Sequence, residues 1–143
     1  MLGKTCKEIN IGDTAEFTKT VSEFDVYSFA GITGDMNPAH IDKTYASKTV
    51  FKQRISHGIL CVGFISNVIA MQLPGPGAIY RNQNCQFVKP VYFGDTVTAI
   101  VEVTRKDEEK NKIWLRTYCI NQDGDLVIDG DAVIMPRKEF EKK

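Results

Sequence analysis

The sequence predicts an α+β domain in which an antiparallel sheet curls around one buried helix. Residues 57–72, "HGILCVGFISNVIAMQ", form the most apolar segment, which is too short and too polar to span a bilayer and therefore indicates a buried helix. Apolar, aromatic and β-branched residues recur as in strands over 96–103, 112–120 and 126–135, and a looser strand pattern covers 14–21. Helices thus cluster in the first half and strands in the second, as in α+β domains.

Length and composition indicate one globular unit. The chain has 143 residues, so we expect residues 1–143 to form a single domain. Hydrophobic residues make up 43% and charged residues 25%, which is enough apolar material for a core. Eighteen basic residues balance eighteen acidic ones, and this balance argues against nucleic acid or a membrane as partner, because an anionic surface selects a basic excess.

The amino-terminal segment and the cysteines indicate a reducing compartment. The first ten residues, "MLGKTCKEIN", turn polar at once and lack the apolar core of a signal peptide. Cys6, Cys61, Cys85 and Cys119 are far apart and form no CxxC pair. We therefore expect reduced thiols in a cytoplasmic protein.

Residue types at the element ends predict the helix boundaries of the first half. Ser22 can cap a helix, and Asp25 three residues later completes an approximate capping box. Gly34 suits a left-handed terminator of that helix. Asp42 can cap a short helix that runs to about Lys48.

Turn residues divide the second half into strands. "LPGPG" at 73–77 ends the apolar helix, and 78–88 is expected to form a further strand although it is unusually polar. "NQDGD" at 121–125 is a hairpin-turn signal, and Gly130 marks a possible bulge in the strand that follows.

The segment "GITGDMNPAH" at 31–40 carries one of the two histidines of the chain next to an acid. Pro38 disfavours helical geometry at Asn37 and removes a backbone donor, so the segment cannot be continuous helix. A rigid loop can direct the side chains of Asp35 and His40 to one point. In the alternative interpretation, Asp35 or Asn37 caps a turn and His40 is a surface residue.

Two features of the apolar helix bear on that choice. Gly58 lies in the first turn, where unpaired N–H groups carry partial positive charge, so a carbonyl oxygen could rest against its amide. The alternative is that Gly58 only permits close packing of the helix on the sheet. Ser66 places a hydroxyl two turns further on, which could serve the site or simply bond to a backbone carbonyl.

Together these groups describe a reaction class, the addition of water to a double bond conjugated with a carbonyl. The reaction needs a base to activate water for attack at C3, an acid to deliver a proton to C2, and donors for the enolate oxygen. A carboxylate and an imidazole can supply the first two. A useful aspartate base must be desolvated or otherwise tuned, which a pocket beside the apolar helix would achieve.

The segment "FAGITGDMNPAHIDKTYA" at 29–46 resembles the signature of the R-specific enoyl-CoA hydratases, also called MaoC-like or hydratase-2 domains. The fixed pattern G-D-x-N-P-x-H is complete, and the small residue a few positions later is Ala46. Further matches are "RISHGIL" (54–60), "LPGPGAIY" (73–80) and "FVKPVYFGDTV" (87–97). Ala39 stands where many relatives carry an aliphatic residue, which leaves the motif intact.

The resemblance implies a hot-dog fold, a curved antiparallel sheet wrapped around a long central helix, paired into a homodimer. It implies reversible hydration of trans-2-enoyl-CoA to (R)-3-hydroxyacyl-CoA, without metal or organic cofactor, coenzyme A being part of the substrate. Asp35 and His40 match the catalytic pair, Gly58 the backbone donor to the thioester oxygen, Ser66 a supporting hydroxyl, and Asn37 the loop-shaping asparagine. We assign Asp35 as base and His40 as proton donor; the reverse, or one water serving both steps, is also compatible.

Three alternatives stay open at this point. Other hot-dog proteins hydrolyse acyl-CoA thioesters, and hydratase-like domains that have lost their site become non-catalytic acyl-CoA-binding subunits. Asp35, His40 and His57 are legitimate metal ligands, although His57 is better interpreted as capping or packing near the helix start. The phosphates of coenzyme A are expected to meet a surface cation such as Arg54, Arg81 or Lys89.

Overall fold

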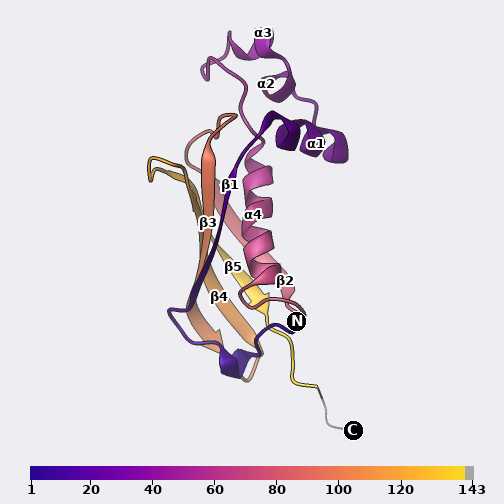
Figure 1. Cartoon of the computed structure of the whole chain (residues 1–143). Helices are drawn as coiled ribbons and strands as arrows, with labels where there is room; N and C mark the ends of the chain where they lie inside the picture. Colours follow the sequence, from indigo (N-terminus) through magenta and orange to yellow (C-terminus); the bar gives the residue numbers. More distant parts are fainter. Residues whose placement is uncertain (141–143) are drawn as a thin grey trace.

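The computed structural model of the chain describes residues 1–140. In Figure 1 a curved sheet lies along one side of a long helix, and three short helices lie beyond one end of both. The elements in chain order are η1 (Cys6–Glu8), β1 (Thr14–Thr20), α1 (Glu23–Thr33), α2 (Pro38–Ile41), α3 (Lys43–Ala46), α4 (Gly58–Met71), β2 (Ile79–Phe87), β3 (Thr96–Asp107), β4 (Lys112–Ile120) and β5 (Leu126–Met135).

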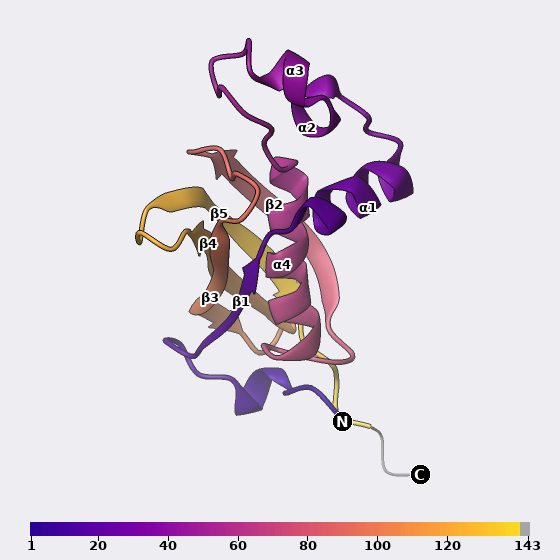
Figure 2. The ribbon, with the colours of Figure 1, turned by 45° about the horizontal axis from the view of Figure 1, so that its top comes forward.

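The five strands form one antiparallel sheet in the order β1-β3-β4-β5-β2. The hairpins β3–β4 and β4–β5 lie at its centre, and β1 and β2 are the two edges. The sheet curls around α4 in the tilted view of Figure 2. The α+β prediction and the hot-dog fold implied by the resemblance are confirmed.

The core forms where α4 meets the sheet. Cys61, Ile65 and Val68 follow one another at spacings of four and three, so they lie on one stripe of the helix, and each is 0% exposed. Along β3 the buried residues alternate with half-buried ones, as one covered sheet face requires. Full burial of an aliphatic side chain contributes about 1.5–3 kcal/mol, so several such residues make this contact a large contribution to stability.

The opposite flank of α4 is open. Ile59, Gly63, Ala70 and Met71 are exposed, although the helix is apolar nearly all round. The sequence indicates a helix wrapped on most sides, but a five-stranded sheet covers one side only. Part of the apolar surface of α4 is therefore left uncovered by the rest of residues 1–140.

The helix ends follow the predicted residues. Ser22 and Asp25 form a reciprocal capping box at the start of α1, and Gly34 ends it with φ 80°. The Asp42 side chain accepts a hydrogen bond from the Tyr45 amide at the start of α3. That helix ends at Ala46, before Lys48, because the chain continues in tight turns.

The predicted bulge at Gly130 is wrong. Gly130 stays in register with Thr117 of β4 and Cys85 of β2. Its role is close approach, because a Cβ at this position would overlap the carbonyl oxygen of Asn84 on the neighbouring strand. The register shifts lie elsewhere, next to Arg81 in β2, Thr104 in β3 and Val127 in β5.

Among the helices of residues 1–140, none has both the length and the apolarity that crossing a membrane requires.

Candidate active site

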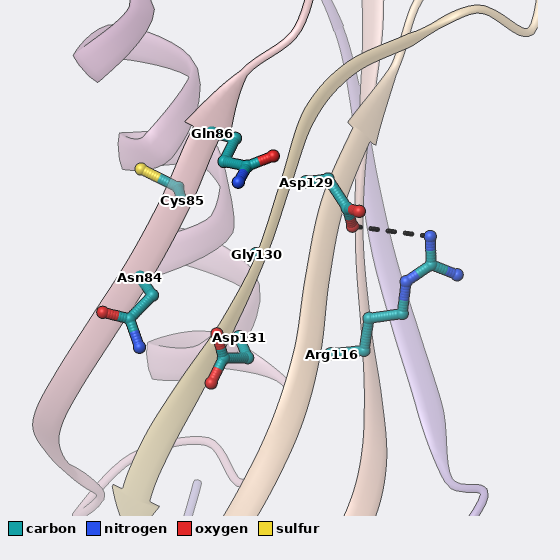
Figure 3. A pocket seen from close by; sticks show the side chains of 7 residues that line it. All are labelled: Asn84, Cys85, Gln86, Arg116, Asp129, Gly130 and Asp131. Atoms are coloured by element: carbon teal, nitrogen blue, oxygen red, sulfur yellow. Dashed lines mark hydrogen bonds and ion pairs between the residues drawn. The ribbon is translucent and has the colours of Figure 1, made fainter.

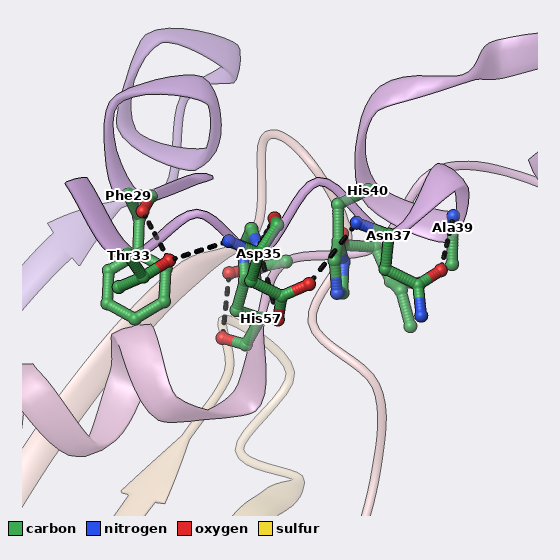
Figure 4. Close-up of polar contacts among 9 residues, drawn as sticks. Phe29, Thr33, Asp35, Asn37, Ala39, His40 and His57 are labelled. Atoms are coloured by element: carbon green, nitrogen blue, oxygen red, sulfur yellow. Dashed lines mark hydrogen bonds and ion pairs between the residues drawn. The ribbon is translucent and has the colours of Figure 1, made fainter. Parts of the chain in front are cut away.

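The turn between α1 and α2 is built from successive side-chain hydrogen bonds to the backbone (Figure 4). The Thr33 hydroxyl donates to the Phe29 carbonyl at 2.8 Å and accepts from the Asp35 amide at 3.2 Å. Asp35 Oδ1 accepts from the Asn37 amide at 3.2 Å, and Asn37 Oδ1 accepts from the Ala39 amide at 3.0 Å. Short polar side chains make such local bonds readily, so this part of the motif shapes its own loop.

His40 is fixed by the segment that leads into α4. Its Nδ1 lies 2.7 Å from the Ile55 carbonyl oxygen, and the Ile55 amide donates to the Ala39 carbonyl at 3.1 Å. A carbonyl only accepts, so Nδ1 carries a hydrogen and Nε2 is the ring atom left to exchange protons. The surface interpretation of His40 is wrong, since the ring is half-buried and oriented.

Asp35 and His40 converge, as the loop interpretation requires. One ligand atom each of Asp35, His40 and His57 lie within 4.8 Å of one another. The Asp35 side chain is 51% exposed, so the desolvation expected for a base is not supplied by residues 1–140. The two catalytic candidates therefore meet at a surface that still admits water.

His57 is the residue whose contacts the sequence did not reveal. Its ring is 3% exposed and stacks on His40 with centroids 3.7 Å apart at an interplanar angle of 27°. Its Nε2 lies 3.0 Å from the Asp35 carbonyl oxygen and 3.8 Å from Asp35 Oδ2. The ring makes no capping hydrogen bond at the start of α4, so it packs there and does not cap. The feature of the sequence that could have identified His57 is its position directly before Gly58, at the start of the apolar helix.

The three clustered residues do not fit a metal well. Metal ligation by imidazole uses a lone pair in the ring plane, and two stacked rings direct their lone pairs side by side instead of toward one ion. His40 Nδ1 and His57 Nε2 each face a carbonyl oxygen. The donor set of Asp35, His40 and His57 is thus better suited to hydrogen bonding and proton transfer.

Gly58 is the first residue of α4, and both interpretations of it have support. A Cβ at Gly58 would lie 2.5 Å from the Phe87 ring, so the glycine allows close packing on β2. Its N–H has no acceptor among residues 1–140 and lies at the partially positive end of the helix. Gly58 also lines a groove of about 320 Å³ together with Ser56, Phe87 and Pro90.

Ser66 is not brought to the Asp35–His40 pair. Ser66 lies eight positions after Gly58, which corresponds to about 12 Å along the helix axis. The side chain is half-buried, and among residues 1–140 its hydroxyl has no hydrogen-bond partner, so the bond to a backbone carbonyl is absent. If Ser66 contributes to the reaction, it does so without contact with Asp35 or His40 of the same chain.

The three cations named for the phosphates differ in availability. Arg54 is held at 2.7 Å by Glu23 and at 2.6 Å by the Tyr27 hydroxyl, and this contact lowers the pKa of Glu23 and raises that of Arg54. Arg81 is exposed on β2. Lys89 lies on the rim of the groove that Gly58 lines, paired at 3.1 Å with Asp125. Of these three cations, Lys89 is the one that lines the same groove as Gly58.

A second hollow of about 570 Å³ lies on the face of the sheet turned away from α4 (Figure 3). It is polar and contains an ion pair between Arg116 and Asp129 at 3.5 Å. Its lining residues come from β2, β4 and β5 and include neither Asp35 nor His40. This hollow is separate from the predicted site.

Known proteins resemble this chain along most of its length. A family model described as the MaoC like domain matches residues 7–122. The (R)-specific enoyl-CoA hydratase of Rhodospirillum rubrum is 51% identical over 129 residues, which make up 90% of this chain and 89% of that protein. The unliganded R-hydratase PhaJ1 of Pseudomonas aeruginosa superposes with a TM-score of 0.91 at 42% identity, over 96% of this chain and 88% of that one. The (R)-hydratase of Aeromonas caviae, involved in PHA biosynthesis, superposes with a TM-score of 0.88 at 38% identity, over 91% and 98% of the two chains. By this extended match of sequence and structure, the chain belongs to the MaoC-like domain family.

Proposed function

We propose that the protein is an (R)-specific enoyl-CoA hydratase, which adds water reversibly to trans-2-enoyl-CoA and gives (R)-3-hydroxyacyl-CoA. The observation that carries the proposal is the convergence of Asp35 and His40 within 4.8 Å, at the amino-terminal end of α4. Relatives named as hydratases, 51% and 38% identical to this chain, support the same reaction. The proposed reaction uses no metal and no organic cofactor, since every step is a proton transfer or the addition of water.

In the proposed mechanism one water molecule lies between Asp35 and His40. The Asp35 carboxylate takes a proton from this water while the oxygen attacks C3 of the enoyl group. The electron pair of the double bond moves toward the thioester and forms an enolate, whose oxygen accepts a hydrogen bond from the Gly58 N–H. Protonated His40 then delivers its Nε2 proton to C2. Asp35 and His40 return to their starting forms by proton exchange with solvent.

Because Asp35 is half exposed, we propose that the bound substrate itself removes water from its carboxylate. A carboxylate in water is a weak base, and its basicity increases when water is removed. An acyl-CoA lying over the turn 33–40 would exclude water from the half-exposed carboxylate. Binding of the acyl-CoA would then also increase the basicity of the Asp35 carboxylate.

We also propose that two chains associate along β2 and the open flank of α4. β2 is an edge strand, so its outer backbone groups have no partner strand in the sheet of residues 1–140. Large apolar side chains are exposed on both elements: Ile59, Met71, Ile79, Tyr80 and Phe87. A second copy of the chain would supply a partner strand for the edge of β2, and it would also cover these apolar side chains.

For the compartment we propose the cytoplasm. Cys6, Cys61, Cys85 and Cys119 are all unpaired. Two of them, Cys61 and Cys119, are buried on the contact between α4 and the sheet. Free thiols persist in reducing compartments, which supports this assignment.

The reaction is tested by incubating the purified protein with crotonyl-CoA. Loss of the enoyl absorbance without release of free thiol is the expected result. Release of free thiol would identify a thioesterase instead. Binding of acyl-CoA without turnover, over several acyl chain lengths, would identify a non-catalytic subunit, and loss of activity in a chelator would restore the metal hypothesis.

Hydrogen-bond donation by the Gly58 amide can be tested separately from the close packing that the glycine permits. In a Phe87→Ala background the space beside position 58 is free, so Gly58→Ala and Gly58→Pro both fit there. Proline is accepted at the first position of a helix, and His57 already has the extended backbone, φ −58° and ψ 130°, that a residue before proline prefers. Only Gly58→Pro removes the N–H. We expect kcat of the proline variant to be about 10²–10³-fold below that of the alanine variant, the usual contribution of one oxyanion donor. Equal values of kcat would leave only the packing role.

A further inference from the structure

His57 contacts both members of the catalytic pair. It approaches the main chain of Asp35 through Nε2, at 3.0 Å from the carbonyl oxygen, and it supports the His40 ring through its face, at a centroid distance of 3.7 Å. On its other side the ring packs at a tilt on Phe29, with centroids 4.8 Å apart. A side chain that is 3% exposed and held between two rings has little freedom to move.

The hydrogen bonds of His57 define its protonation state. The Asp35 carbonyl oxygen is an acceptor only, so Nε2 carries a hydrogen. Nδ1 is buried and has no hydrogen-bond partner among residues 1–140. A second hydrogen on Nδ1 would therefore place a charged ring and an unpaired donor in the interior, which is far more costly than an unpaired lone pair. Asp35 Oδ2, at 3.8 Å, is too distant to accept a hydrogen bond from Nε2.

We propose that His57 is a positioning residue of the hydration reaction, held as the neutral Nε2–H tautomer, which ties the Asp35 main chain to the start of α4 and supports the His40 ring. The inference rests on the proposed function and adds a residue to it. The carboxylate of Asp35 and Nε2 of His40 must both face one water molecule, and they come from different segments, the turn 33–37 and α2. His57 fixes these two segments relative to the Gly58 amide, because it is the residue that precedes it.

Matched substitutions separate the two contacts. His57→Phe keeps an aromatic face under His40 and removes the donor to Asp35. His57→Gln keeps an amide N–H near the position of Nε2 and removes the ring. His57→Ala removes both. A misplacement of reacting groups by about 1 Å can reduce the rate about 100-fold. We expect kcat to fall about 10-fold in each of the first two variants and about 100-fold in the third, while KM stays within about twofold.

The control is Ile65→Val, a core substitution in the same helix, which we expect to lower stability and leave kcat of the folded protein unchanged. A purely structural role of His57 predicts this same behaviour for His57→Phe and His57→Gln. Values of kcat within twofold of the unsubstituted protein in both variants would overturn the inference.

A double variant tests whether His57 acts through Asp35. In an Asp35→Asn background, His57→Phe should lower the residual kcat less than twofold, since the carboxylate that it positions is gone. A full 10-fold loss in that background would contradict the assignment.

A measurement on the unsubstituted protein avoids any loss of folding. Nitrogen-15 NMR of labelled histidine should show the His57 ring as the neutral Nε2–H tautomer at neutral pH. A doubly protonated or Nδ1–H ring would overturn the inference even if crotonyl-CoA is hydrated. Conversely, the NMR result can hold when crotonyl-CoA is not hydrated, in which case the proposed function fails and the hydrogen bond remains.

Discussion

The two sides of α4 differ in how completely one chain covers them. The side that faces the sheet is closed, with Cys61, Ile65 and Val68 each 0% exposed. The opposite flank is open, and the amino-terminal end adjoins the segment 23–57, where Ile32 is 85% exposed and the catalytic candidate Asp35 51%. One chain therefore closes the contact between α4 and the sheet, whereas the opposite flank of α4 and the catalytic turn remain exposed to solvent.

This division separates stability from activity. Buried residues such as Ile65 hold the helix against the sheet, while the turn 33–40 is fixed mostly by local hydrogen bonds and its residues 33–38 are exposed to solvent. Substitutions on the two sides should therefore change different measured quantities.

Substitution of either member of the catalytic pair should lower activity strongly without unfolding the protein. Asp35→Asn and His40→Gln are each expected to lower kcat for crotonyl-CoA hydration by about 10²–10⁴-fold, the usual contribution of an acid or base group. For Asp35→Asn the free energy of unfolding, measured with urea, should change by less than about 1 kcal/mol, because the side chain is half exposed and asparagine has nearly the same shape as aspartate. A folded Asp35→Asn protein with a normal kcat would contradict its role.

Substitution under the sheet should do the opposite. Ile65→Ala removes a fully buried side chain and is expected to lower the free energy of unfolding by about 2–5 kcal/mol. Turnover per folded molecule should stay within about twofold below the unfolding transition. Urea unfolding and assays at low temperature measure the two quantities, and a selective loss of turnover would mean that the two sides are coupled.

The open flank of α4 predicts association. Ile59 is 56% exposed on α4, and Ile11, in the turn before β1, is 64% exposed. Ile59→Arg should convert a dimer to monomer in sedimentation, since a charge would be buried in the contact. Ile11→Arg, with the same chemical change at a similar exposure, should leave the dimer intact. An unsubstituted protein that sediments as a monomer would remove this proposal.

The closed side predicts protected thiols. Burial raises the pKa of Cys61 from 9.0 to about 12 and raises that of Cys119 as well. Because the thiolate is the reactive form, both thiols stay protonated at about pH 8 in the folded protein. In a Cys6→Ser, Cys85→Ser variant, a disulfide reagent should label the native protein at least 100-fold more slowly than the unfolded protein. Comparable rates would show that the core opens readily.

The resemblance in the segment 29–46 indicated the family, and the catalytic candidates could be named from sequence because they lie in one short motif. The turn 33–39 is held by hydrogen bonds between residues two apart, and short polar side chains encode such bonds locally. The aromatic and β-branched residues of 112–120 predicted β4 with its observed bounds, whereas the strand expected over 96–103 continues to Asp107. The bulge at Gly130 failed because a glycine in a strand has two uses, and only the neighbouring strand decides between them.

The sequence by itself determined the α+β order of elements, the capping residues and the proton-transfer groups, since each depends on residues a few positions apart. Only the tertiary structure decided that His57 lies against both Asp35 and His40, that Gly58 faces Phe87, and that Asp35 stays half exposed. These contacts join residues 17 to 29 positions apart, and their geometry depends on how α4 docks on the sheet. No local pattern of residue types contains that information.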